Sequence, residues 1–348
     1  MPFTPFPLMI LEKSGVNLFY PSGSRPPALL SGPMGVSSCD GKTHMVVSGS
    51  MTGTNTHITP PRPASTVIII RKTGRVPQVC LLKRSKRSPF MAGYHVFPGG
   101  TVDEGDKDAL WEKHCDIEGP PWIQKPGRDM PEEDLLPYGI AAVRETFEEA
   151  GILLAHGDGH REKEIASLSD KRCKGALHSG WLKAWVVSRG WRPSLSNLYP
   201  WAHWVTPEVR SKRFDTRFFI TFVAREVTCI PDGRETVEGV WVEPGEALSN
   251  NLNGRLPLSP PTLITLHELL AYRDAGSLHG ALETRTWGTP RCPRLVPASD
   301  GALLVLPWDP GFHDEEISWK VGPGDLLPVG KAFSRLWLQA GIWRPVAP

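Results

Sequence analysis

Runs of apolar and β-branched residues along the chain predict a set of β-strands. The segment Ser65–Arg71 is largely β-branched and has strand length, and a second apolar run, Gln78–Arg84, follows it after Gly74. Because glycine is typical of turns, these two runs are predicted to pair as a hairpin. Further strands are predicted at residues 94–97, 198–205, 214–227 and 235–242.

A second periodicity, with apolar residues three and four positions apart, predicts helices. It is clearest in Gly139–Leu154, whose apolar stripe is formed by Ile140, Val143, Phe147, Ala150 and Leu154. Helical patterning also covers 162–189, and a short helix is predicted at 244–249. A longer helix at 260–273 begins with two prolines, which are favoured in a first helical turn. The apolar faces of these helices are interpreted as packing surfaces.

The polar face of the 139–154 helix carries three glutamates. Glu145, Glu148 and Glu149 are spaced i, i+3 and i+4, so their carboxylates project from the side opposite the apolar stripe. Like charges at this spacing cost ~0.2–0.5 kcal/mol per pair on an exposed helix. A hard cation such as Mg²⁺ would offset this repulsion, whereas the alternative interpretation is an ordinary solvated face. Gly151 follows, where it allows a close backbone approach or ends the helix.

A glycine pair upstream completes a motif with these glutamates. Gly100 ends a Phe-Pro-Gly-Gly turn, and Arg144–Ile152 reads Arg-Glu-Thr-Phe-Glu-Glu-Ala-Gly-Ile. Together they resemble the Nudix box, with Thr146 in place of the usual aliphatic residue. The first acidic position of the box falls on Asp106 instead of a glutamate. It lies 38 positions before Arg144 (144 − 106), where the family has eight, so an insertion of 30 residues splits the box.

A split box of this kind resembles the coenzyme A diphosphatase branch of the Nudix hydrolase superfamily, that of nucleoside-diphosphate-linked moiety X motif 19. The branch shares a Gly-x-His-Val-Phe-x-Gly-Gly sequence, here Gly93–Gly100, and an Arg-Phe-Asp-Thr-x-Phe-Phe strand, here Arg213–Phe219. A second coenzyme A signature, from a sister branch, is only partly present, because Lys83 replaces its threonine and Pro89 its arginine. The resemblance covers roughly residues 64–275.

The resemblance implies an α/β fold, the Nudix α/β/α sandwich, in which a mixed sheet lies between the box helix and the helix at 259–274. It places a Nudix hydrolase domain at 63–275, with the insertion at 107–138, and a C-terminal extension at 276–348. Residues 1–62 are rich in Pro, Gly, Ser and Thr and are predicted to form a disordered leader.

The insertion and the extension are less informative. The insertion is predicted to hold a short helix near 108–115 and to be loop elsewhere. It is interpreted either as a wall of the site or as a surface excursion, with no residue favouring one over the other. The extension contains many prolines and the short apolar run 302–306, and the sequence assigns it no role.

The resemblance also implies the chemistry of the site. The predicted ligands of Mg²⁺ or Mn²⁺ are three carboxylates and one backbone carbonyl, those of Glu145, Glu148, Glu149 and Gly100. Arg144 is predicted to brace the carboxylates through charge-assisted hydrogen bonds. The general base is predicted to be Glu145 or Glu235, which lies six residues before Trp241 as in the family, and the sequence does not choose between them.

A basic segment at the end of the second predicted strand has two interpretations. It contains Lys83, Arg84, Lys86 and Arg87. Lys83, Arg84 and Arg87 are predicted to bind the phosphates of the substrate, because they lie beside the acidic helix in this fold. The alternative interpretation is a solvated basic loop.

The reaction implied is metal-dependent hydrolysis of a pyrophosphate bond in a nucleoside diphosphate derivative. The expected substrate is coenzyme A or an acyl-coenzyme A, cleaved to 3′,5′-ADP and a 4′-phosphopantetheine product. Tryptophans such as Trp122, Trp201 and Trp204 would serve an adenine dinucleotide equally well. The alternatives are therefore an ADP-ribose, NADH or dinucleotide diphosphatase, and a catalytically silent Nudix module that binds a nucleotide or a partner.

Composition excludes some other classes of function. The chain has 348 residues, 40% of them hydrophobic and 22% charged, which is ordinary for a globular protein. A net charge of +2 gives no reason to expect a nucleic-acid or membrane partner. No apolar run approaches the ~18–20 residues of a membrane span. The expected partner is thus a small molecule, and the oligomeric state is left open.

The cysteines and the last residues of the chain are relevant to where in the cell the protein is found. The six cysteines are scattered and match no zinc pattern, so they are predicted to be reduced and unpaired in an intracellular, soluble protein. The ending Val346-Ala347-Pro348 differs from the peroxisomal Ser-Lys-Leu type. The choice among peroxisome, mitochondrion and cytosol therefore stays open.

Overall fold

The strand β1 (Arg62–Arg71) lies in the middle of the main sheet and is buried on both faces. In the computed structural model, which describes residues 58–72, 76–116, 132–157, 162–298, 301–317 and 323–348, Val67 and Ile69 pack into one apolar cluster. Ile68 and Ile70 pack into a second cluster. Successive side chains of a strand point to opposite faces, so the β-branched run supplies both layers of the core.

The main sheet has seven strands and is mixed, as the sequence predicted. Its order is β3-β2-β1-β8-β7, with β4 also pairing with β1 and β9 with β2. The pair β1–β8 is parallel and the other pairs are antiparallel. The remaining strands are β2 (Gln78–Arg84), β3 (His95–Val96), β4 (Gly99–Thr101), β7 (Tyr199–Val205), β8 (Phe214–Val223) and β9 (Thr236–Val242). Strand β8 ends four residues before the predicted position 227.

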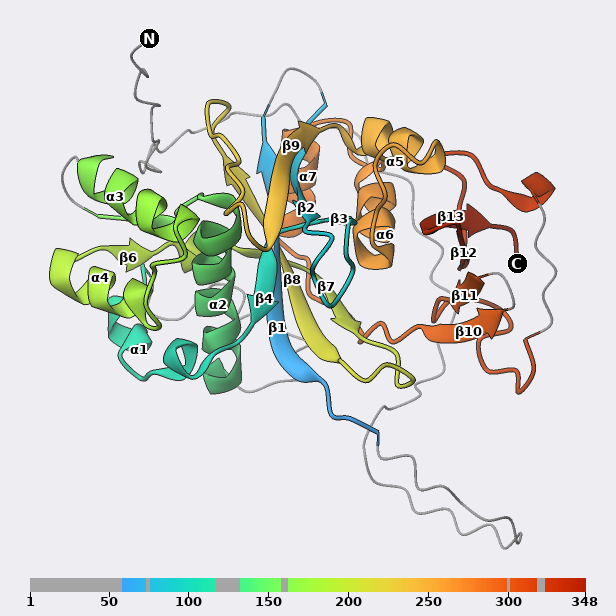
Figure 1. Cartoon of the computed structure of the whole chain (residues 1–348), viewed down its shortest axis with the longest axis horizontal. Helices are drawn as coiled ribbons and strands as arrows, with labels where there is room; N and C mark the ends of the chain where they lie inside the picture. The colour runs from blue at the N-terminus through green and yellow to red at the C-terminus, as the bar shows by residue number, and fades with distance from the viewer. Residues whose placement is uncertain (1–57, 73–75, 117–131, 158–161, 299–300, 318–322) are drawn as a thin grey trace, which may run out of the picture. The chain divides into compact units, whose positions relative to one another are not determined.

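Helices cover both faces of this sheet. Helix α2 (Glu132–Ala150) packs on the face of Val67 and Ile69, whereas α6 (Pro260–Leu269) packs on the face of Ile68 and Ile70 (Figure 1). The α/β/α sandwich is therefore confirmed, with the two helices that the sequence placed on either side of the sheet. Helices α5 (Pro244–Leu252) and α7 (Ala275–Leu282) join the α6 side.

The box helix differs from its prediction at both ends. It begins at Glu132, seven residues before Gly139, and so takes in part of the insertion that was expected to be loop. It ends at Ala150, because Gly151 has a φ of +71° and cannot continue a right-handed helix. Leu154 is buried as predicted, but it lies beyond the helix.

The segment around the glycine pair forms a short strand and not a simple turn. Gly99 and Gly100 belong to β4, which pairs with β1 through Thr66 and Ser65. A Cβ atom on Gly99 would overlap the backbone of Ser65 and Thr66, so only glycine allows this close pairing. The pairing brings β4 beside the box helix.

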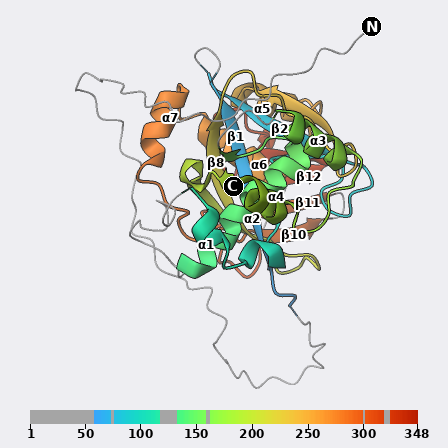
Figure 2. The same cartoon turned by 90° about the vertical axis from the view of Figure 1, so that its left-hand side faces the viewer.

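Smaller helices lie on the α2 side of the sheet. The insertion contains α1 (Trp111–His114), in the place of the predicted short helix, and the 3₁₀ helix η1 (Glu104–Lys107) precedes it. The helical patterning at 162–189 corresponds to α3 (Glu162–Cys173) and α4 (Trp181–Arg189). Figure 2 looks onto this side. Residues 117–131, with Trp122, lie outside the described residues, as does the predicted leader up to residue 57.

The C-terminal extension forms a second sheet that the sequence did not predict. It is antiparallel, with β10 (Arg294–Ala298), β11 (Gly301–Val305), β12 (Arg335–Gln339) and β13 (Ile342–Val346) in that order. The apolar run 302–306 largely coincides with β11. Leu304, Leu336 and Trp343 belong to the same apolar cluster as α6, so the extension packs on the main sheet's α6 side.

The remaining elements are short. They are the two-stranded pair β5 (Ala155–His156) and β6 (Arg192–Pro193), and the 3₁₀ helices η2 (Leu195–Asn197) and η3 (Pro323–Asp325).

The prediction of unpaired thiols is wrong for two of the six cysteines. Cys80 in β2 and Cys229, 149 residues apart in the chain, form a disulfide. The β2–β9 pairing explains their proximity, because Cys80 lies opposite Trp241 and a Cβ on the nearby Gly239 would contact Cys229. Such a contact between distant segments leaves no trace in cysteine spacing.

No membrane-spanning helix is found among the residues that the structure describes.

The buried side chain of Asn251 should be essential for attachment of the C-terminal sheet. Its Nδ2 donates to the carbonyl of Trp343 (2.8 Å), and its Oδ1 accepts from the amide of Leu258 (3.0 Å). Asn251→Ala would leave both backbone groups unpaired, so we expect the free energy of unfolding to fall by about 2–4 kcal/mol. Urea denaturation would measure this change.

The neighbouring Asn250 supplies the control. Its backbone carbonyl accepts the amides of Arg255 and Leu256, and a substitution keeps that carbonyl. Asn250→Ala should change the free energy of unfolding by less than about 0.5 kcal/mol. Equal losses in the two variants would contradict the role given to Asn251.

Candidate active site

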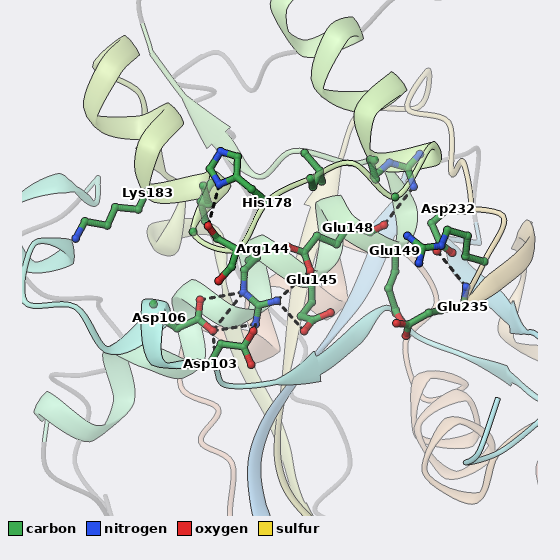
Figure 3. Close-up of a pocket in the computed structure, with 18 of the residues that line it drawn as sticks. Asp103, Asp106, Arg144, Glu145, Glu148, Glu149, His178, Lys183, Asp232 and Glu235 are labelled. Atoms are coloured by element: carbon green, nitrogen blue, oxygen red, sulfur yellow. Dashed lines mark hydrogen bonds and ion pairs between the residues drawn. The ribbon is translucent and has the colours of Figure 1, made fainter.

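The candidate site is organised by a buried arginine, Arg144, in the middle of α2. Its Nε and Nη2 donate to both carboxylate oxygens of Asp106, at 2.9–3.3 Å. Its Nη1 donates to Glu145 (2.9 Å) and to Glu148 (3.0 Å), and Nη2 also donates to the carbonyl of Thr101 (2.8 Å). Figure 3 shows the guanidinium between Asp106 and Glu145. Burial disfavours its charge, but the bonds with Asp106 and the nearby glutamates raise the pKa of Arg144 overall.

Asp106 closes the gap that the insertion makes in the box. It lies in η1, where its carboxylate also accepts the backbone N–H of Asp103 (2.8 Å), and only 3% of it is exposed. The 38-residue separation from Arg144 therefore becomes a direct ion pair of 2.9 Å. Asp106 stands where the family usually has a glutamate, and it still makes this contact.

Two of the three glutamates have strongly raised pKa values. Burial, opposed by Arg144 and aided by the charge of Glu148, raises the pKa of Glu145 to about 7. Burial and the charge of Glu145 raise the pKa of Glu149 to about 8. The carboxylates thus repel one another in a poorly hydrated site, and any added positive charge would stabilise their ionised forms.

Glu148 is held from a second direction. Its Oε1 accepts the indole N–H of Trp181 (2.6 Å), the first residue of α4, while Oε2 accepts from Arg144. Burial raises the pKa of Glu148, although Arg144 and the indole bond oppose this effect. The Trp181 ring also packs on Phe147, with centroids 4.8 Å apart. Helix α4 therefore positions this carboxylate.

The glycine pair of β4 approaches the glutamates closely. The amide of Gly99 donates to Oε2 of Glu149 (3.0 Å). A Cβ on Gly100 would overlap the carboxylate of Glu145, so any other residue would displace that side chain. Gly100 therefore lies beside the carboxylates, and the role of its carbonyl as a metal ligand stays a prediction.

The donor set fits a hard divalent cation. Three carboxylates line the cavity beside Gly100 and offer oxygen donors of the kind that Mg²⁺ and Mn²⁺ prefer. Within the described part of the chain, however, no three His, Cys, Asp or Glu side chains are gathered at metal-binding geometry. Arg144 holds Glu145 and Glu148, and Gly99 holds Glu149. Binding an ion would therefore require these carboxylates to reorient.

Two cavities meet at the glutamates. The smaller has a volume of about 320 Å³ and the larger about 560 Å³, both within the ~300–1,000 Å³ typical of small-molecule sites. Six residues line both: Asp103, Arg144, Glu145, Glu148, Glu149 and Glu235. The smaller cavity is otherwise largely polar, with Arg172, Lys183 and Arg234 in its wall. The larger is mostly apolar.

The predicted base Glu235 lies at the boundary of the cavities, just before β9. Its amide donates to Asp232 (3.0 Å) and its carbonyl accepts the amide of Ser85 (2.8 Å), so the backbone is held on both sides. The side chain of Glu235 is exposed, and its charge adds to the raised pKa of Glu149. The structure thus brings together both candidate bases.

The structure separates the predicted basic residues. Arg84 lines the larger cavity and lies 3.8 Å from Glu149, and its guanidinium also donates to the carbonyl of Phe90 (3.1 Å). Lys83 pairs instead with Glu238 (3.3 Å) and lines neither cavity. Lys83 and Arg84 are consecutive residues of β2, and successive side chains of a strand point to opposite faces, so the two point apart. Arg87 is exposed and also lies outside both cavity walls.

Two residues near the site carried no signal as site residues in the sequence. Trp181 and Arg172 belong to segments with ordinary helical patterning, and Arg172 donates to the carbonyl of Glu148 (3.3 Å). The box motif indicates Asp106 as its acidic position, but not the contact of Asp106 with Arg144. Detecting their contacts would have required knowing that α3, α4 and η1 fold back onto α2.

The chain is similar to one protein family and to several known proteins. The model of the NUDT19 Nudix domain matches residues 61–269. The human acyl-coenzyme A diphosphatase NUDT19 is 29% identical over 303 residues, covering 74% of this chain and 80% of that protein. The chicken protein of the same name is 28% identical, covering 75% and 82%. A solved Nudix hydrolase from Alicyclobacillus acidocaldarius is 28% identical and covers 67% of this chain and all of its own, with a TM-score of 0.55.

Removing the Asp106 carboxylate should destabilise the protein and impair the site. Asp106→Ala leaves part of the buried Arg144 charge uncompensated, so we expect the free energy of unfolding to fall by about 3 kcal/mol. The exposed Asp103, whose carboxylate lies 3.8 Å from Arg144, gives the matched control. Asp103→Ala should cost less than about 1 kcal/mol. Denaturant titration of both variants would test this, and similar losses would contradict the assignment.

Metal affinity should depend steeply on pH. Because burial raises the pKa values of Glu145 and Glu149 to about 7 and about 8, both carboxyls bind protons as the pH falls from 8 to 6. An incoming cation must displace those protons, so the dissociation constant for Mg²⁺ should rise at least about tenfold over that range. Titration calorimetry in buffers of different ionisation enthalpy would measure the affinity and the proton release.

The raised pKa values also predict how the stability of the metal-free protein changes with pH. Carboxyls with raised pKa values bind protons more tightly in the folded than in the unfolded state, so stability should decrease as the pH rises through 7 and 8. An affinity for Mg²⁺ that does not change with pH, without proton release, would rule out these glutamates as ligands.

Proposed function

The chain belongs to the NUDT19 Nudix domain family and is a Nudix hydrolase, and on this premise we propose that it cleaves the pyrophosphate bond of coenzyme A or an acyl-coenzyme A. The observation that carries the proposal is the position of the carboxylate cluster between a polar and a mostly apolar cavity. Coenzyme A has the same division, with a nucleotide on one side of its diphosphate and a long pantetheine arm on the other. Relatives named acyl-coenzyme A diphosphatases support this choice.

Nudix hydrolases generally use divalent metal ions, and we propose Mg²⁺ or Mn²⁺ here. Glu145, Glu148 and Glu149 would hold the ion, with the backbone carbonyl of Gly100 as a further ligand. A bound ion polarises a phosphoryl oxygen and lowers the pKa of a coordinated water. The remaining roles, which are positioning, phosphate binding and proton transfer, are assigned to residues of the chain.

Arg144 and Asp106 have a positioning role in this proposal. Arg144 donates to Glu145 and Glu148, and Asp106 fixes Arg144 through a bidentate pair, so the carboxylates are kept next to one another. Arg84, which borders the larger cavity 3.8 Å from Glu149, would bind a phosphate of the diphosphate. Lys83 and Arg87 point elsewhere and are not needed for this contact.

The proton of the attacking water would pass to Glu145 or Glu235. Both line both cavities and so border the space in which the attacking water would lie. Glu145 already accepts a bond from Arg144, whereas the Glu235 side chain is exposed to the cavity. The exposed Glu235 is therefore proposed as the base, and Glu145 as a metal ligand once its carboxylate has reoriented.

A substrate panel tests the proposal. Purified protein with Mg²⁺ or Mn²⁺ should cleave coenzyme A or an acyl-coenzyme A to 3′,5′-ADP and the matching 4′-phosphopantetheine, detected by chromatography. ADP-ribose, NADH and dinucleoside polyphosphates should be cleaved with a kcat/KM at least about tenfold lower. Glu148→Gln and Glu149→Gln should each lower turnover by at least about 10²-fold.

Two results would contradict the proposal. A kcat/KM for ADP-ribose or NADH more than about tenfold above that for every coenzyme A species would assign the alternative substrate class. Full turnover in EDTA, or in either glutamine variant, would exclude the metal role of these glutamates. Circular dichroism of the variants serves as the control for folding.

A further inference from the structure

The wall of the larger cavity opposite the main sheet comes from the C-terminal extension. Leu295 of β10, Leu304 of β11 and Trp343 of β13 line it. Leu295 and Leu304 are direct partners in the β10–β11 pairing, so their side chains share a face. Trp343 lies on the same face, because it pairs with Leu338, which in turn pairs with Ala302, two residues before Leu304.

The facing wall is aromatic and belongs to the main sheet. Trp204 of β7 and Phe218 of β8 are buried in it, and Phe214 is the first residue of β8. Phe90, from the loop after β2, packs edge-to-face on Phe214 with ring centroids 5.5 Å apart. The cavity therefore runs between two apolar surfaces from different parts of the chain.

The lining of this cavity has a charged part and an apolar part. Glu145, Glu149 and Arg84 form the charged part, where the diphosphate would be cleaved. The walls of the extension supply aliphatic and aromatic carbon. A ligand that matches this gradient has a diphosphate at one end and a hydrocarbon chain at the other.

We propose that the sheet β10–β13 forms the compartment that binds the acyl chain of an acyl-coenzyme A. This inference rests on the proposed function and deepens it, because it makes acyl-coenzyme A, rather than free coenzyme A, the preferred substrate. The pantetheine arm would lie between the carboxylates and the compartment, which line the same cavity. Leu295, Leu304 and Trp343 are then residues that determine chain-length specificity.

The attachment of the extension makes its wall a fixed boundary. Asn251 binds the carbonyl of Trp343 (2.8 Å), and the hydroxyl of Tyr94 donates to the carbonyl of Gly341 (2.8 Å). Trp343, Leu304 and Leu336 also share a cluster with the α6 side of the main sheet. A wall held at several points limits the length of chain that the cavity accepts.

The nucleotide half of the substrate is the competing occupant. The exposed Arg210 and Lys212 border the same cavity, and aromatic rings stack on adenine. Two of the three extension residues argue against it, because Leu295 and Leu304 offer no hydrogen-bonding groups to the polar edge of a purine. The polar residues Arg172, Lys183 and Arg234 line the smaller cavity instead, which suits the nucleotide half.

The test compares binding and turnover along a series of acyl chains. With the wild-type protein, kcat/KM should increase at least about tenfold from coenzyme A to octanoyl-coenzyme A, since each buried methylene adds affinity. In the Glu149→Gln background, which prevents turnover, calorimetry should show octanoyl-coenzyme A binding at least about tenfold more tightly than coenzyme A. Tighter binding of octanoyl-coenzyme A by the Glu149→Gln variant, with no turnover by the wild-type protein, would contradict the proposed hydrolysis but support the compartment.

Two substitutions on β10 form a matched pair. Leu295→Trp fills the compartment and should lower the octanoyl-to-coenzyme A ratio of kcat/KM, and of affinity, at least about tenfold. Val296→Trp places the same ring on the next residue, whose side chain packs in the apolar cluster on the opposite face of the sheet, and should leave both ratios unchanged. Leu304→Ala enlarges the compartment, so the preferred chain should become longer.

The outcomes of these experiments distinguish the acyl chain from the nucleotide half as the occupant of the larger cavity. If Leu295→Trp lowers kcat/KM and affinity equally for coenzyme A and octanoyl-coenzyme A, the proposal is overturned. Such a result would place the nucleotide half, which both ligands share, in this cavity. Equal ratios in Leu295→Trp and Val296→Trp would overturn it as well. If Leu295→Trp fails to fold, an unchanged chain-length preference in Leu304→Ala is the overturning result.

Discussion

The candidate site depends on the buried ion pair between Arg144 and Asp106. A buried guanidinium is stable only when its charge is compensated, and the hydrogen bonds with Asp106 are the largest single contribution to that compensation. Arg144 can then hold Glu145 and Glu148 through its remaining nitrogen. The same pair joins the two halves of a motif that an insertion has separated, so it links catalytic geometry to folding.

The central sheet explains why the site has two unlike sides. Strand β1 is buried on both faces, and each face has its own layer of helices. The site lies where β4 meets α2, between a polar cavity bordered by α3 and α4 and an apolar one closed by the C-terminal sheet. A substrate with chemically different halves can therefore be bound on both sides of the bond that is cleaved.

Much of the fold could be predicted from the chain, because strands and helices bury one face each and leave a period in the sequence. The β-branched run of β1, the stripe of α2 and the prolines that open α6 all have local causes, and all three elements are where the sequence placed them. The limits of the elements were less accurate. Helix α2 extends back to Glu132, and the extension forms a sheet from short runs that have no clear period.

For the site, the sequence by itself determined which residue types were available: the i, i+3, i+4 glutamates, the arginine before them and the glycine pair that lets β4 approach. These follow from helix geometry and from the steric freedom of glycine, which are local properties. Only the tertiary structure decided that Trp181 holds Glu148, that Arg84 and not Lys83 faces Glu149, and that Leu295, Leu304 and Trp343 line the larger cavity. Each of those contacts joins segments far apart in the chain. Their pairing is set by how elements pack, which no short stretch of sequence encodes.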